Sequence, residues 1–408
     1  MFSEKICSAS ILALERAFSR DLREYSPEEC AEFGDRLSDV FGEKGEILRA
    51  YTKEEQGFVE NELLMTKASY KYWSERYCFI NAEGTGLKKM FPLLETQEYV
   101  LRRLGKREEE IAEIGGGGIF VNFLKGSRQV GGSTLAESIL CHRATTQNNI
   151  FGLMASHEPG PKGSGYLFAM FERMYEGLPW WLKPAETAHV KNEEIAFEGG
   201  TRLWVESGKA MKGVKGQRGQ IGRGLTISMA HFSELSTWEL PEPIKDSFLP
   251  GVPRAARTFI FLESTAKGRN NWWHAHWKNS PDSVWKFVNI FIPWYVEMKY
   301  SEPPPVGWVM KQTTLQHAKQ IEETSLGCIG KRVSPTKEQL YWWELMRQSF
   351  EVDGNLKKFL EEFGSIDSDA CFQFSGSSIF KTETIERVAM QARPLAGVLE
   401  IAPMGRLR

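Results

Sequence analysis

The chain has 408 residues, of which 41% are hydrophobic and 25% are charged. At about 150 residues per domain, this length indicates two to three domains, and the composition excludes a disordered tail or a fibre. The 51 Lys and Arg residues against 53 Asp and Glu residues give a net charge of −2, which excludes a protein that coats nucleic acid through an overall basic excess.

The six cysteines are scattered, without a CxxC pair or a metal-ligand spacing. We therefore expect the protein to be located in a reducing cytoplasm and to have no zinc site. We expect His274 and His276 to have structural roles. The segment 6–18 is too short, and too interrupted by charge, for a signal peptide, and no run reaches about 18 apolar residues. These features predict a soluble protein.

The N-terminal part has the pattern of polar helices. Ser26 followed by Pro27 is typical of a helix start, and apolar residues recur at helical spacing through 58–72. After a break at 83–86, the spacing predicts a helix over 95–107.

The central part predicts an α/β domain. An apolar β-prone segment, 119–124, runs into a glycine-rich turn and then a helix that opens at Ser133 and Thr134. Further strands are expected at 150–155, 195–197, 202–205, 225–229, 259–262 and 284–291. Strands separated by such helical or loop segments predict a mostly parallel sheet flanked by helices, with the hairpin turned at Gly199 and Gly200 as an insertion or an edge.

The glycine-rich turn matches a phosphate-binding pattern: a glycine, four residues, a second glycine, one variable residue and a hydroxyl residue. It is formed by Gly126, Ser127, Arg128, Gln129, Val130, Gly131, Gly132 and Ser133. Backbone N–H groups and the following helix N-terminus can hold phosphates there, and the Ser133 hydroxyl can ligate Mg²⁺. The usual lysine position holds Gly132, so Lys125 and Arg128 are the candidate cations. A glycine-rich turn before an ordinary helix is the alternative.

Two further strand ends carry residues suited to phosphate chemistry. The segment 225–229 leads to Ser233 and Glu234, where a P-loop ATPase keeps the carboxylate that activates water. The usual preceding aspartate is replaced by Ser233, so Mg²⁺ would be held by Ser133, phosphate oxygens and waters. The segment 259–262 leads to Glu263 and then to Ser264 and Thr265, and the hydroxyls of these last two residues could sense the γ-phosphate.

Together these motifs resemble the ATPase domain of the large terminase subunit of tailed bacteriophages, the motor that packages DNA into procapsids. The resemblance covers roughly residues 55–380 and includes 92–97, which is similar to that family's adenine-recognition segment. It implies a P-loop NTPase of the ASCE, RecA-like class.

The resemblance also implies residue roles. Gln97 would contact adenine, and Glu234 would be the catalytic carboxylate, reaching Mg²⁺ through water. The ATP phosphates and Mg²⁺ would be held by Lys125, Arg128 and 131–134, with Ser133 as the metal ligand and Thr134 beside it. Ser264 and Thr265 would couple hydrolysis to movement.

An arginine that reaches a neighbouring subunit's nucleotide is also implied. Arg223 lies where some family members carry it, and Arg128 acting in cis is the alternative. The surrounding stretch, 202–223, has six Lys or Arg against one Glu. This pattern is typical either of a solvated loop or of a segment that contacts phosphates or a neighbouring subunit.

The expected organisation has four parts: a helical N-terminal segment (1–84), the ATPase core (85–302), a helical lid (303–365) and a linker (366–408) toward a nuclease domain that we expect to be missing. The implied partners are double-stranded DNA, the portal protein, the small terminase subunit and like subunits in a ring, in the host cytoplasm at the portal. Two alternatives are a helicase-like ATPase and a catalytically weak nucleotide-binding assembly module.

Overall fold

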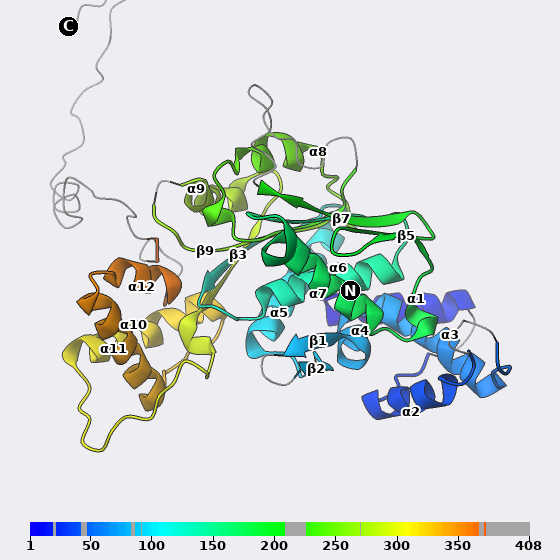
Figure 1. Cartoon of the computed structure of the whole chain (residues 1–408), viewed down its shortest axis with the longest axis horizontal. Coiled ribbons are helices and arrows are strands. Elements are labelled where there is room, and N and C mark those ends of the chain that lie inside the picture. Colours follow the sequence, from blue (N-terminus) through cyan, green and yellow to red (C-terminus); the bar gives the residue numbers. More distant parts are fainter. Residues whose placement is uncertain are drawn as a thin grey trace, which may run out of the picture. The chain divides into compact units, whose positions relative to one another are not determined.

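A central sheet organises the protein. The computed structural model describes residues 1–18, 22–41, 47–82, 86–90, 92–208, 226–269, 271–366 and 371–372, all within one unit, Met1–Gln373. Within these ranges eight strands form one sheet in the order β10-β3-β9-β8-β4-β7-β6-β5, and β1 pairs with β2 separately (Figure 1). The strands are β1 (Phe79–Ala82), β2 (Gly86–Lys89), β3 (Ile119–Gly126), β4 (Phe151–Ser156), β5 (Glu186–Val190), β6 (Glu194–Phe197), β7 (Thr201–Ser207), β8 (Met229–Phe232), β9 (Phe259–Thr265) and β10 (Val288–Pro293).

The sheet is parallel from β10 through β7, and only β6 and β5 run antiparallel to their neighbours. Its central strands are buried on both faces, because helices cover both sides. Figure 1 shows α5, α6 and α7 on one side of the sheet and α8 and α9 on the other. The helices are α1 (Glu4–Phe18), α2 (Pro27–Leu37), α3 (Lys53–Ala68), α4 (Tyr70–Tyr77), α5 (Glu95–Ile114), α6 (Gly132–Thr146), α7 (Ser164–Glu176), α8 (Leu249–Gly251), α9 (Trp272–Asn279), α10 (Gln312–Ile329), α11 (Lys337–Val352) and α12 (Leu356–Glu362).

The strand order identifies the fold class. Strand β3 leads into the glycine-rich loop, and β8 is the strand that ends before Glu234. Strand β9 lies between β3 and β8 in the sheet. A mostly parallel sheet of this order, flanked by helices, agrees with the predicted P-loop NTPase fold class, which is thus confirmed. Since β3, β8 and β9 are parallel, their carboxyl ends meet at one edge of the sheet.

Two predicted strands lie later in the chain than expected. The strand predicted at 225–229 is paired over Met229–Phe232, and it includes His231, a polar residue that hydropathy places outside a strand. The strand predicted at 284–291 is Val288–Pro293, because a 3-10 helix (Ser280–Asp282) and a turn with Lys286 at φ 53° precede it. Helix α5 continues past 107 to Ile114, where Gly115 ends it in the left-handed conformation.

In Figure 1 the C-terminal helices α10 to α12 lie at one end of the sheet, whereas the N-terminal helices α1 to α4 lie on the side of the sheet that α5 to α7 cover, with α4 packed against α6. Ser26 caps α2 with Pro27 in the first turn, as predicted. Trp294, just after β10, donates its indole N–H to Ser365, and its backbone N–H to the carbonyl of Gly364. The C-terminal helices are thus attached beside the exit of β3.

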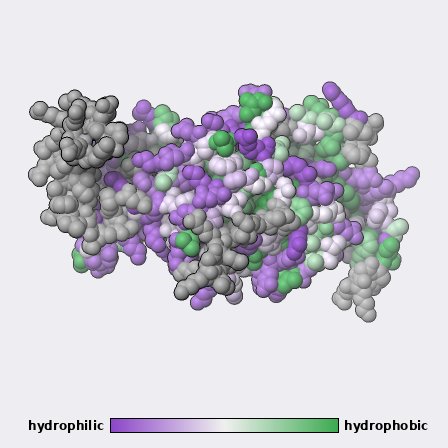
Figure 2. Space-filling view, turned by 90° about the horizontal axis from the view of Figure 1, so that it is seen from above, coloured by the Kyte–Doolittle hydropathy of each residue, from purple (hydrophilic) through white to green (hydrophobic). Residues whose placement is uncertain are grey.

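Hydrophilic residues predominate on the described part of the face shown in Figure 2, and the hydrophobic ones form small separate groups. No helix among the described residues is both long and apolar enough to cross a membrane.

Candidate active site

The glycine-rich loop after β3 is tightly packed. Gln129 and Gly131 adopt left-handed backbone conformations, with φ of 56° and 72°. A Cβ on Gly126 would lie 2.7 Å from the carbonyl oxygens of Ile292 and Gly364, and a Cβ on Gly132 would lie 2.4 Å from the ring of Phe123. The glycines at both ends of the loop are therefore required by packing. The position that usually carries the phosphate-binding lysine has no room here for a side chain.

Gly132→Ala is therefore expected to lower the free energy of unfolding by about 1–3 kcal/mol, the usual cost of overpacking a core. The matched control is Gly57→Ala in α3, where an added Cβ meets nothing within 4 Å. This control should be neutral or stabilising by roughly 0.5–1 kcal/mol, because alanine loses less backbone entropy in a helix. Urea unfolding of both variants is the measurement, and equal stabilities would contradict the packing argument.

The start of α5 braces the loop from outside. Thr96 donates its hydroxyl to the carbonyl of Val130 at 2.9 Å, and Gln97 donates its side-chain N–H to the carbonyl of Gly131 at 3.3 Å. The Gln97 side-chain oxygen accepts from the backbone N–H of Leu94. Gln97 is thus buried against the loop, and its contact with adenine stays a prediction.

Lys125 is the cation at the centre of the site. It stands in β3 just before the loop, and its side chain is only 11% exposed. Its Nζ lies 2.6 Å from Oε1 of Glu234 and 3.8 Å from Oε1 of Glu263. Burial lowers the pKa of Lys125, but the two carboxylates raise it by more, so its pKa lies above the ordinary value. Lys125 is therefore a positive charge at the mouth of the loop.

Arg128, the other candidate cation, points elsewhere. Its side chain is 73% exposed and pairs with Glu362 of α12, with Nε 3.0 Å from Oε2. Its carbonyl accepts a hydrogen bond from the hydroxyl of Tyr300. Arg128 thus joins the loop to the C-terminal helices, and of the two cations Lys125 is the one that contacts Glu234.

Glu234 stands two residues after the end of β8 and has a left-handed backbone, with φ 58° and ψ 40°. Such a conformation is costly for a residue other than glycine, and it is concentrated at functional sites. The side chain is 42% exposed, so a ligand at the loop can reach its carboxylate. The structure thus brings together Lys125 and Glu234 from two strand ends.

A second carboxylate, Glu263 in β9, is completely buried beside Lys125 and Glu234. Its Oε1 accepts hydrogen bonds from the hydroxyls of Ser133 at 2.5 Å and Ser233 at 2.7 Å. It also lies 3.3 Å from Nε2 of His231. Burial raises the pKa of Glu263, but Lys125 and His231 lower it by more, so this carboxyl is ionised.

His231 joins Glu263 to a further buried carboxyl. Its Nδ1 lies 2.6 Å from Oε1 of Glu137 in α6. Burial lowers the pKa of His231, but the hydrogen bond to Glu137 and the nearby carboxylate of Glu263 raise it to about 9. The three side chains form a continuous row from α6 through β8 to β9.

The sequence patterns predict no functional role for Glu263, His231 or Glu137. A signal was present, because all three are charged or polar residues inside apolar runs, where such residues are buried only when paired. Their partners lie about 30 to 130 residues apart in the chain. Pairings over such distances are not visible in local patterns.

The predicted coupling residues lie at the end of β9. The Ser264 hydroxyl accepts from the backbone N–H of Ser236 at 2.9 Å and donates to the Ser236 hydroxyl. Ser236 stands two residues after Glu234, so the end of β9 is tied to the turn that carries Glu234. Thr265 is the register partner of Lys125.

The remaining predicted residues are placed as follows. Ser127 is buried in the loop, and Thr134 lies in the first turn of α6. Arg223 and the basic residues at 209–223 lie outside the described residues, as do 373–408.

His276 lies 3.1 Å from Oδ1 of Asn122, as a structural histidine would. Within the described ranges, no group of three or more His, Cys, Asp or Glu could hold a metal ion.

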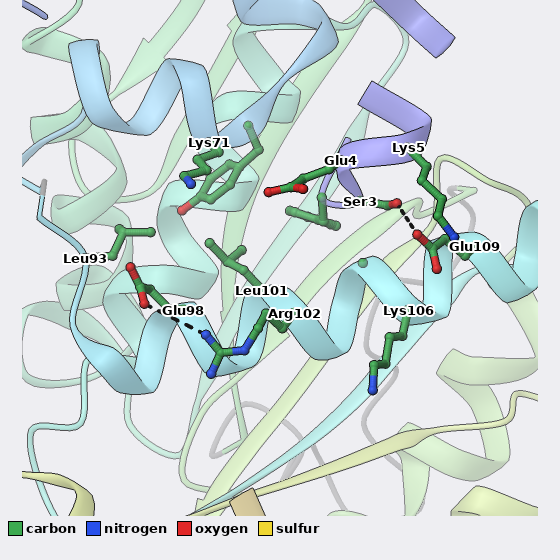
Figure 3. A pocket seen from close by; sticks show the side chains of 13 residues that line it. Ser3, Glu4, Lys5, Lys71, Leu93, Glu98, Leu101, Arg102, Lys106 and Glu109 are labelled. Carbon is green, nitrogen blue, oxygen red and sulfur yellow. Dashed lines mark hydrogen bonds and ion pairs between the residues drawn. The ribbon is translucent and has the colours of Figure 1, made fainter. Parts of the chain in front are cut away.

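A separate cavity of about 540 Å³ lies away from the loop, between the N-terminal residues, α4 and α5. Figure 3 shows Arg102 pointing toward Glu98, and Ser3 hydrogen-bonded to Glu109. The charged side chains that line this cavity thus pair in part with one another. None of the residues predicted to bind nucleotide lines it.

The chain matches no protein-family model and no curated protein. In structure it is similar to the large terminase of bacteriophage HK97, with a TM-score of 0.46, 12% identity, and coverage of 74% of this chain and 55% of that one. It is also similar to a large terminase of a thermophilic bacteriophage in complex with ATP-gamma-S (TM-score 0.35, 15% identity, 56% and 49% covered). A third is the large terminase ATPase domain of Thermus phage P74-26 (TM-score 0.35, 12% identity, 63% and 91% covered). The chain spans about half the length of the first two.

Proposed function

We propose that this chain is the ATP-hydrolysing motor domain of a terminase large subunit, which drives double-stranded DNA into a procapsid through the portal. The observation that carries the proposal is the contact between Lys125 and Glu234 beside the glycine-rich loop, 2.6 Å apart. A phosphate-binding cation and a general base are the two groups that ATP hydrolysis needs at this edge of an ASCE sheet.

The residues present fit a magnesium nucleotide. The loop has left-handed backbone at Gln129 and Gly131, and α6 begins directly behind it, so a phosphate could be held at the N-terminus of α6. Oε2 of Glu263 is buried and has no hydrogen-bond partner among the described residues. The other oxygen of this carboxylate, Oε1, accepts the hydroxyl hydrogen of Ser133. Ser133 would hold Mg²⁺, which when bound neutralises charge on the phosphates.

Glu234 would accept the proton of the attacking water. In the structure its carboxylate is neutralised by Lys125, whose ammonium also lies next to the loop. A triphosphate at the loop offers Lys125 a second anion, and this would leave Glu234 free to act as a base.

Movement would be coupled to hydrolysis through contacts at both sides of the loop. Ser264 ties the end of β9 to the turn after Glu234. In α12, Glu362 holds Arg128, while Glu361 accepts from the backbone N–H of Gly268 just after β9. A change at the phosphates can therefore reach the C-terminal helices through two carboxylates.

The proposed partners are double-stranded DNA, the portal protein, the small terminase subunit and like subunits in a ring. Arg223 of a neighbouring subunit is proposed to complete the site, with Arg128 in cis as the alternative. A ring that needs such an arginine predicts a specific ATPase activity that rises with protein concentration.

The test is ATP hydrolysis by the full chain, combined with displacement of a third strand from a linear DNA triplex. We expect hydrolysis that double-stranded DNA stimulates, and triplex displacement without separation of the duplex strands. Strand separation would identify a helicase instead. Nucleotide binding without turnover at any protein concentration would identify an assembly module.

A further inference from the structure

Position 233 departs from the usual P-loop ATPase pattern. Ser233 stands directly before Glu234, where an aspartate normally assists the magnesium site. A serine has no charge with which to attract a cation or polarise a metal-bound group. The site therefore needs its second carboxylate from elsewhere in the fold.

Glu263 supplies a carboxylate at the same place from the neighbouring strand. The Ser233 hydroxyl donates to its Oε1 at 2.7 Å, so the two side chains are in direct contact. The same oxygen accepts the hydroxyl hydrogen of Ser133 at 2.5 Å. A hydroxyl whose hydrogen is held in this way presents its lone pairs to the opposite side, the orientation that a metal ligand requires.

We propose that Glu263 is the carboxylate that orients Ser133 for magnesium, in place of the aspartate missing at position 233. This inference rests on the proposed function, since it concerns the metal that accompanies ATP. Glu263 is a positioning residue, because it acts through the Ser133 hydroxyl.

The surroundings of Glu263 support this assignment over a purely structural one. Its Oε2 is buried and accepts no hydrogen bond among the described residues, although buried carboxylate oxygens are ordinarily satisfied. Glu234, the other nearby carboxylate, contacts Lys125 and not Ser133. His231, held by Glu137 on its other side, fixes the rotation of Glu263 through the contact at 3.3 Å.

In the part of the chain that the structure describes, no three or more His, Cys, Asp or Glu side chains are grouped so that they could hold a metal ion by themselves. Mg²⁺ is usually bound through one or two protein groups together with substrate phosphates. The role of Glu263 should therefore appear as a dependence of nucleotide affinity on Mg²⁺ and not as metal binding by the protein alone.

The experiment compares the Kd of ATP-gamma-S with Mg²⁺ and with EDTA, by calorimetry on the full chain. The ratio of the two constants defines the metal enhancement. Glu263→Gln keeps the shape of the side chain and removes its charge, and we expect the enhancement to fall roughly 10- to 100-fold, as for other groups that orient metal ligands. Glu62→Gln is the matched control, because Glu62 is also fully buried but lies in α3, where it accepts hydrogen bonds from Tyr72 and Tyr77 of α4.

A rescue variant tests whether the metal enhancement depends on a carboxylate at this place or only on the stability of the fold. Because Ser233 and Glu263 touch, an aspartate introduced at 233 brings a carboxylate to the same place. The double variant Ser233→Asp with Glu263→Gln should regain most of the metal enhancement. Thermal melting of each variant establishes that it is folded.

The outcomes distinguish the two proposals. If the unaltered chain binds no ATP-gamma-S, the proposed function fails and this inference fails with it. If the chain binds with a metal enhancement that Glu263→Gln leaves unchanged, the inference alone is overturned. Loss in Glu263→Gln without recovery in a folded double variant overturns it as well, since a carboxylate at that place is what the inference requires.

Discussion

Glu234→Gln should reduce steady-state ATP turnover by about 10²- to 10⁴-fold, the usual contribution of a general base. The amide can still hold a water molecule, but it cannot accept the proton. Binding of ATP-gamma-S should persist, because the substitution releases Lys125 from its contact at 2.6 Å and leaves it for the phosphates.

The measurement is a coupled ATPase assay, with fluorescent-nucleotide binding to the same preparation. Glu242→Gln serves as the control, because Glu242 is exposed and lies well past the turn that carries Glu234. Turnover that stays at the level of the control would remove Glu234 from the mechanism.

Lys125→Ala should weaken ATP-gamma-S binding by about 1.5–3 kcal/mol, or roughly 10- to 150-fold, the value of a hydrogen bond to a charged group. Arg128→Ala should have a smaller effect, because Arg128 is exposed and pairs with Glu362. Lys125→Arg keeps the charge and should retain part of the affinity.

Calorimetry with ATP-gamma-S and Mg²⁺ measures all three variants, after thermal melting has shown that each is folded. A larger loss in Arg128→Ala than in Lys125→Ala would transfer the phosphate-binding role to Arg128. A lysine introduced at Gly132 is no useful comparison, because its Cβ would lie 2.4 Å from the Phe123 ring.

Local patterns in the sequence were sufficient for several elements. The run at 119–124 is apolar on both faces, which is typical of a central parallel strand, and it forms most of β3. The pair of glycines at 199 and 200 predicted the turn between β6 and β7, and both have positive φ. Ser26 with Pro27 predicted the start of α2 because capping depends on adjacent residues.

The strand order could not be read from the sequence, because it depends on pairing between distant segments. Nothing local in 259–265 shows that this strand inserts between β3 and β8. The same insertion brings Glu263 against Ser133 and Ser233, so this second carboxylate of the site was missed for the same reason. Lys125 and Glu234 were predicted as two separate candidate residues, but the contact between them, across 109 residues of the chain, was not predicted.

The most direct test of the central claim is a crystal structure of the chain with ATP-gamma-S and Mg²⁺. We expect the phosphates to lie against the loop at 126–134, with Lys125 turned from Glu234 toward them and Ser133 beside the metal. Nucleotide bound elsewhere, for example in the cavity between the N-terminal residues and α5, with the Lys125–Glu234 contact still in place, would contradict it.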